Sequence, residues 1–316
     1  MKFGNIFLYN NAWTLYFIGI ISLVLVLFFG KTVNSARCWF NIPLIGTLQP
    51  SEFMKIFLII LLSRMITNFN DDYKYHTITD ELKFIIKVLL VVLVPSVLTF
   101  IEPDTGAVIM YLVITFSMLF IGALRKRWFI FTILFFVLFV GTFILIYFLD
   151  NDLFIKLFGT SFFYRMDRIT NWSNSSGMQL NNSLIAIGSA GLTGHGINHT
   201  PIYFPEMQTD FIFAVFTSNF GFIGALFLII LIVFFDLNLI STVNKTHNLA
   251  DNYSIGGILA VLLFSQIYNI AMTVGLLPIM GITLPFISYG GSSILSYMIL
   301  LGMIFNVSNE DLRYTN

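Results

Sequence analysis

Eight apolar runs constrain this chain more than any other feature of its sequence. A helix that crosses a bilayer needs about 20 mostly apolar residues, and each run meets or approaches that length. The runs are Trp13–Phe29, Pro50–Ile66, Phe84–Ile101, Gly106–Leu124, Trp128–Leu149, Phe211–Phe235, Ile255–Leu277 and Gly290–Val307. With 57% hydrophobic and only 10% charged residues, the chain has too little polar surface for a soluble protein of 316 residues. The sequence therefore predicts an all-α, polytopic membrane helix bundle of about eight spans.

The distribution of Lys and Arg among the loops predicts the orientation of the bundle. These residues favour the cytoplasmic side of a membrane. With the N-terminus inside, ten of them face the cytoplasm and five face outward, and the opposite orientation reverses this excess. We therefore expect a multi-pass protein with both termini in the cytoplasm. The formal net charge is zero, which offers no bulk attraction to nucleic acid.

A long loop, about residues 150–210, separates the fifth run from the sixth and lies outside in this orientation. It is far longer than a usual connection, and such loops are typically functional or disordered. No internal repeat divides the chain, so we expect one transmembrane domain over residues 1–316.

Charged residues near the predicted membrane boundaries are candidate site residues, and each has a structural alternative. Glu52 and Lys55 lie three apart on the second run, where we favour an ion pair that lets the helix insert. Asp104 lies in a tight outer turn and either caps the next helix or belongs to a site. Asp210 stands where a polar loop enters an uninterrupted apolar helix. Partial desolvation there makes a carboxylate a better proton acceptor, although an N-cap is an equal alternative.

Pro and Gly residues break the segment Gly275–Ser293 between the seventh and eighth runs. Irregular backbone at membrane depth exposes amides, and a glycine-rich turn that leads into a helix can bind an anion such as pyrophosphate. Ser288, Gly290 and Gly291 are the candidate residues, and a simple hairpin is the alternative.

No metal site is predicted. Cys38 is the only cysteine, which excludes a cysteine cluster. His195 and His199 lie four apart, but no third ligand has a convincing spacing.

Six motifs in order along the chain resemble those of the SEDS family, the peptidoglycan polymerases that include RodA, FtsW and SpoVE. The matching blocks are Asn34–Trp39, Gln49–Lys55, Glu102–Gly106, Gly188–Gly196, Pro205–Phe213 and Asn269–Ser293. The Ile-Pro dipeptide before the Gln-Pro-Ser-Glu block favours a RodA-like member. The family has ten spans, and the Gln-Pro-Ser-Glu block belongs to its fourth, so we expect this chain to lack the first two.

The resemblance also implies roles for individual residues. Asp210 matches the essential carboxylate of the family, Arg37 and Trp39 match outer-loop residues, and Asp104 matches the acid of a Gln-Pro-Asp block. Glu52 and Lys55 match an intramembrane pair. The chain departs from the family pattern at several positions, which are Ser35, Glu102, Ala190, His195, Ser218 and Asn219.

The function implied by the resemblance is inverting glycosyl transfer in a bacterial cell membrane, for cell shape or division. Asp210 is expected to deprotonate the sugar hydroxyl that attacks lipid II, a polyprenyl-pyrophosphate disaccharide. Arg37, Arg168 and the backbone near Gly290 are the candidate donors to the leaving pyrophosphate. A divalent cation, Mg²⁺ or Mn²⁺, would assist there, and no organic cofactor is expected. The implied partner is a class B penicillin-binding protein, a transpeptidase.

Two alternatives come from other functional classes. A lipid II flippase needs a polar path through its spans, for which the sequence offers only Lys55, Ser265, Gln266 and Asn269. A non-catalytic scaffold would keep the fold and the contact with the transpeptidase. The missing spans and the altered glycine block favour the scaffold, whereas the intact Pro205–Phe213 block opposes it.

Overall fold

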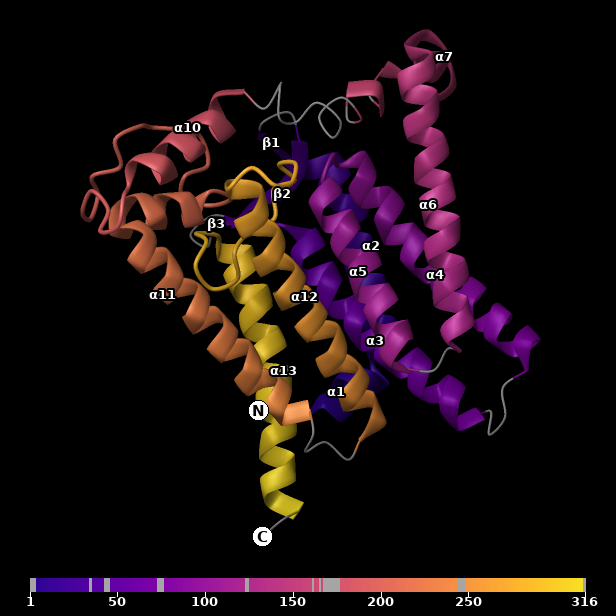
Figure 1. The fold of residues 1–316 in the computed structure, drawn as a ribbon. Coiled ribbons are helices and arrows are strands. Elements are labelled where there is room, and N and C mark those ends of the chain that lie inside the picture. Colours follow the sequence, from indigo (N-terminus) through magenta and orange to yellow (C-terminus); the bar gives the residue numbers. More distant parts are fainter. Residues whose placement is uncertain are drawn as a thin grey trace.

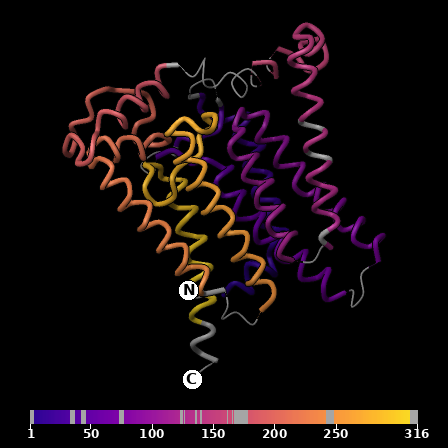
Figure 2. The backbone as a smooth tube through the Cα atoms, in the orientation of Figure 1, coloured from indigo at the N-terminus to yellow at the C-terminus, as the bar shows by residue number. Residues whose placement is uncertain are grey.

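The computed structural model describes residues 4–33, 36–42, 46–72, 77–122, 125–160, 162–164, 166, 177–243 and 248–314. It is a bundle of long helices (Figure 1). The first and last described residues lie at the same end of the bundle, as the backbone trace shows (Figure 2). We call this the inner end, and we call the opposite end, near α7 and α10, the outer end.

The eight predicted spans are all helical, which confirms the predicted membrane helix bundle. The described helices are α1 (Asn5–Asn10), α2 (Ala12–Phe29), α3 (Pro50–Asp72), α4 (Ile78–Ile101), α5 (Thr105–Gly122), α6 (Lys126–Leu149), α7 (Asn151–Phe158), α10 (Gly177–Ser189), α11 (Ile212–Val243), α12 (Leu249–Thr273) and α13 (Gly291–Tyr314). The predicted runs correspond to α2–α6 and α11–α13. Six of these helices, α2, α4, α5, α11, α12 and α13, have a stretch long and apolar enough to cross a membrane.

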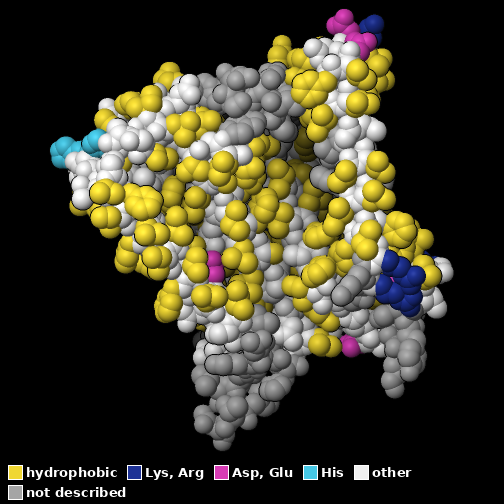
Figure 3. Space-filling model, in the orientation of Figure 1, with side chains coloured by type: hydrophobic (Ala, Val, Ile, Leu, Met, Phe, Trp, Pro, Cys, Tyr) yellow, Lys and Arg dark blue, Asp and Glu magenta, His cyan; other side chains and the backbone are white. Residues whose placement is uncertain are grey.

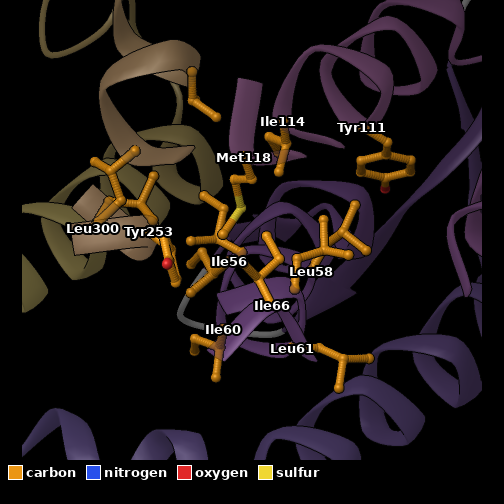
Figure 4. Packing of buried hydrophobic residues seen from close by; sticks show 14 of the residues in the cluster. Ile56, Leu58, Ile60, Leu61, Ile66, Tyr111, Ile114, Met118, Tyr253 and Leu300 are labelled. Atoms are coloured by element: carbon orange, nitrogen blue, oxygen red, sulfur yellow. The ribbon is translucent and has the colours of Figure 1, made fainter. Parts of the chain in front are cut away.

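Helix α3 forms the centre of the bundle. It contacts α2, α4, α5, α12 and α13, and residues 58–62 are at most 1% exposed. Figure 4 shows Ile60 of α3 in the same packed region as Met118 of α5 and Leu300 of α13. Because protein surrounds α3, its polar side chains meet other helices and avoid the cost of facing lipid. This explains why the second run carries more charge than the other spans.

The face of the bundle drawn in Figure 3 is largely apolar among the described residues. Large rings stand outward on several spans, such as Phe29 at 76%, Phe148 at 69% and Phe227 at 62% exposure. A soluble protein rarely exposes so continuous an apolar surface. Lipid tails are the environment that suits it.

A small antiparallel sheet, which the sequence did not predict, connects α2 with α3 at the outer end. Its strands are β1 (Lys31–Val33), β2 (Ala36–Ile42) and β3 (Gly46–Leu48), in the order β1-β2-β3. Lys31 pairs with Trp39 and Thr32 with Arg37. The strands are too short for a clear alternating pattern, so the all-α prediction holds for the spans and misses this sheet.

Helix α11 is interrupted, so the prediction of an uninterrupted helix after Asp210 is wrong. Gly221 has a φ of 66° and a ψ of −166°, and the loop 191–196 enters at this point. The amides of His195 and Gly196 donate to carbonyls of α11, and a Cβ on Gly194 would lie 2.3 Å from one of them. Figure 1 shows that the helix changes direction here. The first turns of α11 are therefore fixed by the outer loop.

Candidate active site

The turn between α4 and α5 places the carboxylate of Asp104 at the outer end. Three donors hydrogen-bond it: Nε2 of Gln49 at 2.8 Å, Oγ of Ser51 at 2.9 Å and the amide of Ala107 at 3.0 Å. The bond from Ala107 caps α5, and the other two connect α5 to the start of α3. Burial raises the pKa of Asp104, and these three bonds oppose that rise. Asp104 is thus both the predicted cap and the centre of a polar cluster.

The predicted pair of Glu52 and Lys55 is present as an ion pair. Their charged atoms are 2.8 Å apart, and the side chains are 13% and 3% exposed. Ser296 of α13 also donates to Glu52, with Oγ 2.9 Å from Oε2. The Lys55 ammonium also lies 5.3 Å from the ring centroid of Tyr297. The ion pair is therefore present as the structural interpretation predicted, and it also joins α3 to α13, which was not predicted.

The loop before α11 presents Asp210 beside two buried aromatic rings. Phe204 and Phe211 are both fully buried, and their ring centroids lie 5.8 Å apart. Between them, Glu206 adopts a left-handed φ of 58°, and Oγ1 of Thr209 donates to its carboxylate at 2.7 Å. The rings hold the loop at both ends, and Asp210 is half-buried just before the helix.

The carboxylate of Asp210 accepts no hydrogen bond from the residues that the structure describes. In the described part of the chain, no amide at the start of α11 donates to it. The alternative in which Asp210 acts as an N-cap is therefore not realised here. Its two oxygens have no donor among the described residues.

The main chain around Asp210 is held firmly, in contrast to its side chain. Nδ2 of Asn269 on α12 donates to the carbonyl of Asp210 and to that of Ile282, at 2.8 Å in both cases. Oγ of Ser288 donates to the carbonyl of Thr209 at 2.6 Å. The segment before α13 and helix α12 therefore fix the position from which the carboxylate projects.

Two close backbone approaches connect Asp104 with Asp210. A Cβ on Gly106, in the first turn of α5, would lie 2.4 Å from the carbonyl oxygen of Met280. The next residue, Gly281, has a φ of 69°, and a Cβ there would lie 3.7 Å from Oδ2 of Asp210. The first turn of α5 thus lies against Met280, and a side chain on the adjacent Gly281 would lie beside the carboxylate of Asp210.

Burial is the main cause of a raised pKa at Asp210. The nearby carboxylates of Glu206 and then Asp104 add to the effect and bring the pKa to about 7. A carboxylate with this pKa is partly ionised at neutral pH and accepts a proton more readily than an ordinary aspartate.

The start of α13 lies close to the same loop. The amide of Tyr289 donates to the carbonyl of Gln208 at 2.8 Å, and Gly290 and Gly291 follow directly. A side chain at Gly291 would meet no atom within 4 Å, so the space beside it is open. Gly291 follows Tyr289 by two residues, and two residues of extended chain span at most about 7 Å. The first amides of α13 therefore lie beside the Asp210 loop. Such amides favour an anion.

Glu102 is a site neighbour that the sequence analysis recorded only as a departure from the family. It is fully buried, and neither carboxylate oxygen has a partner among the described residues. Burial, and then the charge of Asp104, raise the pKa of Glu102 to about 8. Gln49, Asn269 and Ser296 were also absent from the predicted site. Each is an isolated polar residue in or beside an apolar run, and that feature of the sequence could have identified them.

The structure does not bring every predicted residue to this place. Side chains alternate along β2, so Arg37 and Trp39 lie on one face of the strand and Cys38 lies on the other. Sγ of Cys38 donates to the carbonyl of Glu102, directly after α4. Both side chains therefore point away from the turn between α4 and α5. Nη1 of Arg37 donates instead to the carbonyl of Leu27 at 3.1 Å. Arg168 lies outside the described residues.

The described residues do not form a protein cage for a metal ion. Among them, no group of three or more His, Cys, Asp or Glu side chains is placed to hold one. Asp104 and Asp210 interact electrostatically, but three donors already occupy the carboxylate of Asp104.

These features define a class: a multi-pass membrane protein with an acidic site at the outer end of its helices. A family model described as a cell cycle protein, for FtsW, RodA and SpoVE, matches residues 2–312. The chain therefore belongs to the FtsW, RodA and SpoVE family, the family that the motifs predicted.

Relatives and solved structures agree with this assignment. A probable peptidoglycan glycosyltransferase FtsW from Coxiella burnetii is 35% identical, over 94% of this chain and 78% of its own length. Stage V sporulation protein E from Bacillus subtilis is 30% identical, over 92% and 76%. The crystal structure of the rod shape determining protein RodA from Thermus thermophilus matches with a TM-score of 0.67 at 24% identity, over 98% of this chain and 81% of that one.

A chain from a peptidoglycan synthase complex that coordinates polymerization and crosslinking matches with a TM-score of 0.79 at 23% identity. The match covers 98% of this chain and 84% of that one. At these identities the solved structures confirm the fold. The expectation of a RodA-like member stays a prediction.

Proposed function

We propose that this chain is a peptidoglycan glycosyltransferase that polymerises lipid II, with Asp210 as the general base. One observation carries the proposal: Asp210 is a carboxylate with a raised pKa and no described donor, on a firmly held main chain at the outer end of the helices. The names of the FtsW relatives support the same activity.

The chemistry needs a base at the membrane boundary. The acceptor hydroxyl gives its proton to Asp210, its oxygen bonds to the anomeric carbon, and the bond from that carbon to the pyrophosphate breaks. The polyprenyl pyrophosphate leaves with the electron pair, and the configuration at the anomeric carbon inverts. The lipid tail stays among the apolar helices while the sugar remains in water, which explains why a base belongs at this level.

The leaving pyrophosphate gains negative charge and needs donors. Of the predicted donors, the amides around Gly290 lie beside the Asp210 loop, whereas the guanidinium of Arg37 donates to the carbonyl of Leu27. We assign the α13 amides to the pyrophosphate because they approach without bringing a side chain into the site.

Cation dependence is a separate proposal. Because the described residues form no cage, a divalent cation would arrive with the pyrophosphate, as Mg²⁺ commonly does with phosphates. We expect EDTA to lower polymerisation and added Mg²⁺ or Mn²⁺ to restore it.

The proposal includes a partner and an orientation. A class B penicillin-binding protein would cross-link the product, in line with the complex described above. Both termini would be cytoplasmic in a bacterial cell membrane. Their position at one end of the bundle agrees with an even number of spans.

The flippase alternative loses support from the contacts of its four polar residues. Lys55 pairs with Glu52, and Asn269 donates to two carbonyls. Gln266 donates to Asp236 and Ser265 donates to a carbonyl of its own helix. Each of these groups serves helix packing, so together they do not form an open polar path.

The test is polymerisation of labelled lipid II by the purified chain, with and without a transpeptidase. Asp210→Asn should lower the rate by about 10²-fold to 10⁴-fold, the usual contribution of a general base. Asp152→Asn is the matched control, because it removes an exposed carboxylate on α7, at the same end of the bundle but outside the site, and should retain activity. No glycan from folded wild type, with or without the partner, would favour the scaffold alternative.

A further inference from the structure

A cavity of about 280 Å³ lies toward the inner end, between α2, α3 and α4. Its walls combine basic, acidic and aromatic side chains. The lining residues are Trp13, Arg64, Met65, Asn68, Phe69, Asp72, Asp80, Lys83, Phe84 and Lys87. None of them belongs to the acidic site at the outer end.

Three cations of this cavity have no counterion in the described structure. Arg64, Lys83 and Lys87 form no ion pair with any described carboxylate, whereas Glu52 and Glu81 are both paired elsewhere in the bundle. Of the two acidic residues in the wall, Asp80 accepts from Thr77 as part of the cap of α4. Three positive side chains against two carboxylates leave an excess of one positive charge in the cavity. Such an excess suits a singly charged anion.

The cavity also lies at the edge of the apolar layer. The apolar run of α2 begins at Trp13, Arg64 lies two residues before the end of that of α3, and α4 becomes continuously apolar only after Lys87. Trp13 is 43% exposed, and exposed Trp side chains are typical of the membrane interface. A ligand in this cavity would therefore meet lipid tails on one side and the aqueous phase on the other.

We propose that this cavity binds the phosphate of an anionic phospholipid headgroup. Arg64 and the two lysines would contact the phosphate, and Trp13 would pack beside the glycerol region. Basic pockets between membrane helices bind anionic headgroups in this way. A free phosphate ion shares the charge but lacks the acyl chains that would lie along the apolar faces of α2 and α4.

The test measures lipid binding to the full chain and does not depend on polymerisation. Delipidated protein in detergent is titrated with phosphatidylglycerol or with phosphatidylcholine, and the bound lipid is counted by native mass spectrometry. We expect one phosphatidylglycerol to bind more tightly than phosphatidylcholine. The triple variant R64Q/K83Q/K87Q should weaken phosphatidylglycerol binding on the order of 100-fold, since each cation near a membrane surface contributes about 1 kcal/mol.

A matched triple variant, K31Q/R127Q/K156Q, removes three exposed cations outside the cavity and should retain binding. Asp72→Asn should tighten binding, because it removes a repelling carboxylate from the wall. If the first triple variant does not fold, Lys87→Gln alone should weaken binding about fivefold and the K83R/K87R variant should retain it.

Three results would overturn the proposal. They are equal affinity for the two lipids, equal loss in both triple variants, and displacement of phosphatidylglycerol by sodium phosphate at equal concentration. The last result would identify free phosphate as the ligand of the cavity.

Discussion

Asp104 and Asp210 lie at the same end of the bundle, yet their surroundings are opposite. The carboxylate of Asp104 receives three hydrogen bonds, from Gln49, Ser51 and Ala107. The carboxylate of Asp210 receives none from the described residues, and only its main chain is held. One acid is thus used by the fold, while the other is positioned by the fold and left available.

The comparison also separates the causes of their pKa values. Burial raises the pKa of both acids, but only Asp104 has hydrogen bonds that oppose the rise. Nothing in the described structure offsets the burial of Asp210. This makes Asp210 the better proton acceptor near pH 7 and makes Asp104 a residue that positions its neighbours.

The largest expected effect on stability is that of Asp104→Ala. It removes the cap of α5 and leaves the donors of Gln49 and Ser51 unsatisfied, so we expect a loss of about 2–4 kcal/mol in the free energy of unfolding. Asp210→Ala should lose no stability and should gain some at pH 7, since it breaks no described side-chain hydrogen bond and removes a carboxylate whose charged form is disfavoured by burial. Denaturant unfolding in detergent measures both variants. Equal losses would show that Asp210 also has a structural role.

The pH dependence of polymerisation is the next test of this difference. A base must be ionised, so kcat/KM should fall about tenfold per pH unit below the pKa of Asp210 near 7, and about 100-fold by pH 5. Above that pKa the rate should level off. A rate that stays constant from pH 5 to pH 8 would contradict Asp210 as the base.

Gly106→Ala tests whether the two acids are coupled through the backbone. Its Cβ would lie 2.4 Å from the carbonyl of Met280, so Met280 and the adjacent Gly281 must move, and a Cβ on Gly281 would lie 3.7 Å from Oδ2 of Asp210. Because small displacements in an active site are costly, we expect a loss of about 10-fold to 100-fold in kcat. Gly188→Ala is the control, because a side chain there meets no atom within 4 Å. Equal rates in both variants would contradict the coupling.

The sequence predicted the elements of this protein better than their contacts. Lengths of apolar runs located eight long helices, six of which have a stretch long and apolar enough to cross a membrane, because lipid requires long apolar helices wherever the chain crosses. The Glu52 and Lys55 pair followed from helical spacing alone. The break at Gly221 could not be predicted in this way, since the loop 191–196 that causes it is distant in sequence.

The site shows the same limit. Asp210 was found from its position between a polar loop and an apolar run, but only the hydrogen bonds of the structure showed that it is not an N-cap. Arg37 was predicted as a donor to pyrophosphate from its outer-loop motif. The alternation of side chains along β2 points it away from Asp104, and that strand was not predicted.

The last expected effect is a dependence of stability on pH, and it concerns Glu102, a third acid beside Asp104. Its folded pKa of about 8 lies above the ordinary value of 4.5, so the folded state keeps a proton that the unfolded state releases. The stability that this proton contributes is complete below pH 4.5 and is lost as pH rises through about 8, at about 1.4 kcal/mol per pH unit.

Glu102→Gln removes this titration, because an amide keeps the shape of the side chain and cannot ionise. We expect the unfolding free energy of wild type to fall relative to the variant between pH 6 and pH 8, and the difference to stop changing at higher pH. Parallel curves for the two proteins would mean that Glu102 is ionised when folded, with a partner that stabilises its charge. In that case, Asp210 would have a raised pKa and no compensating contact, and Glu102 would not.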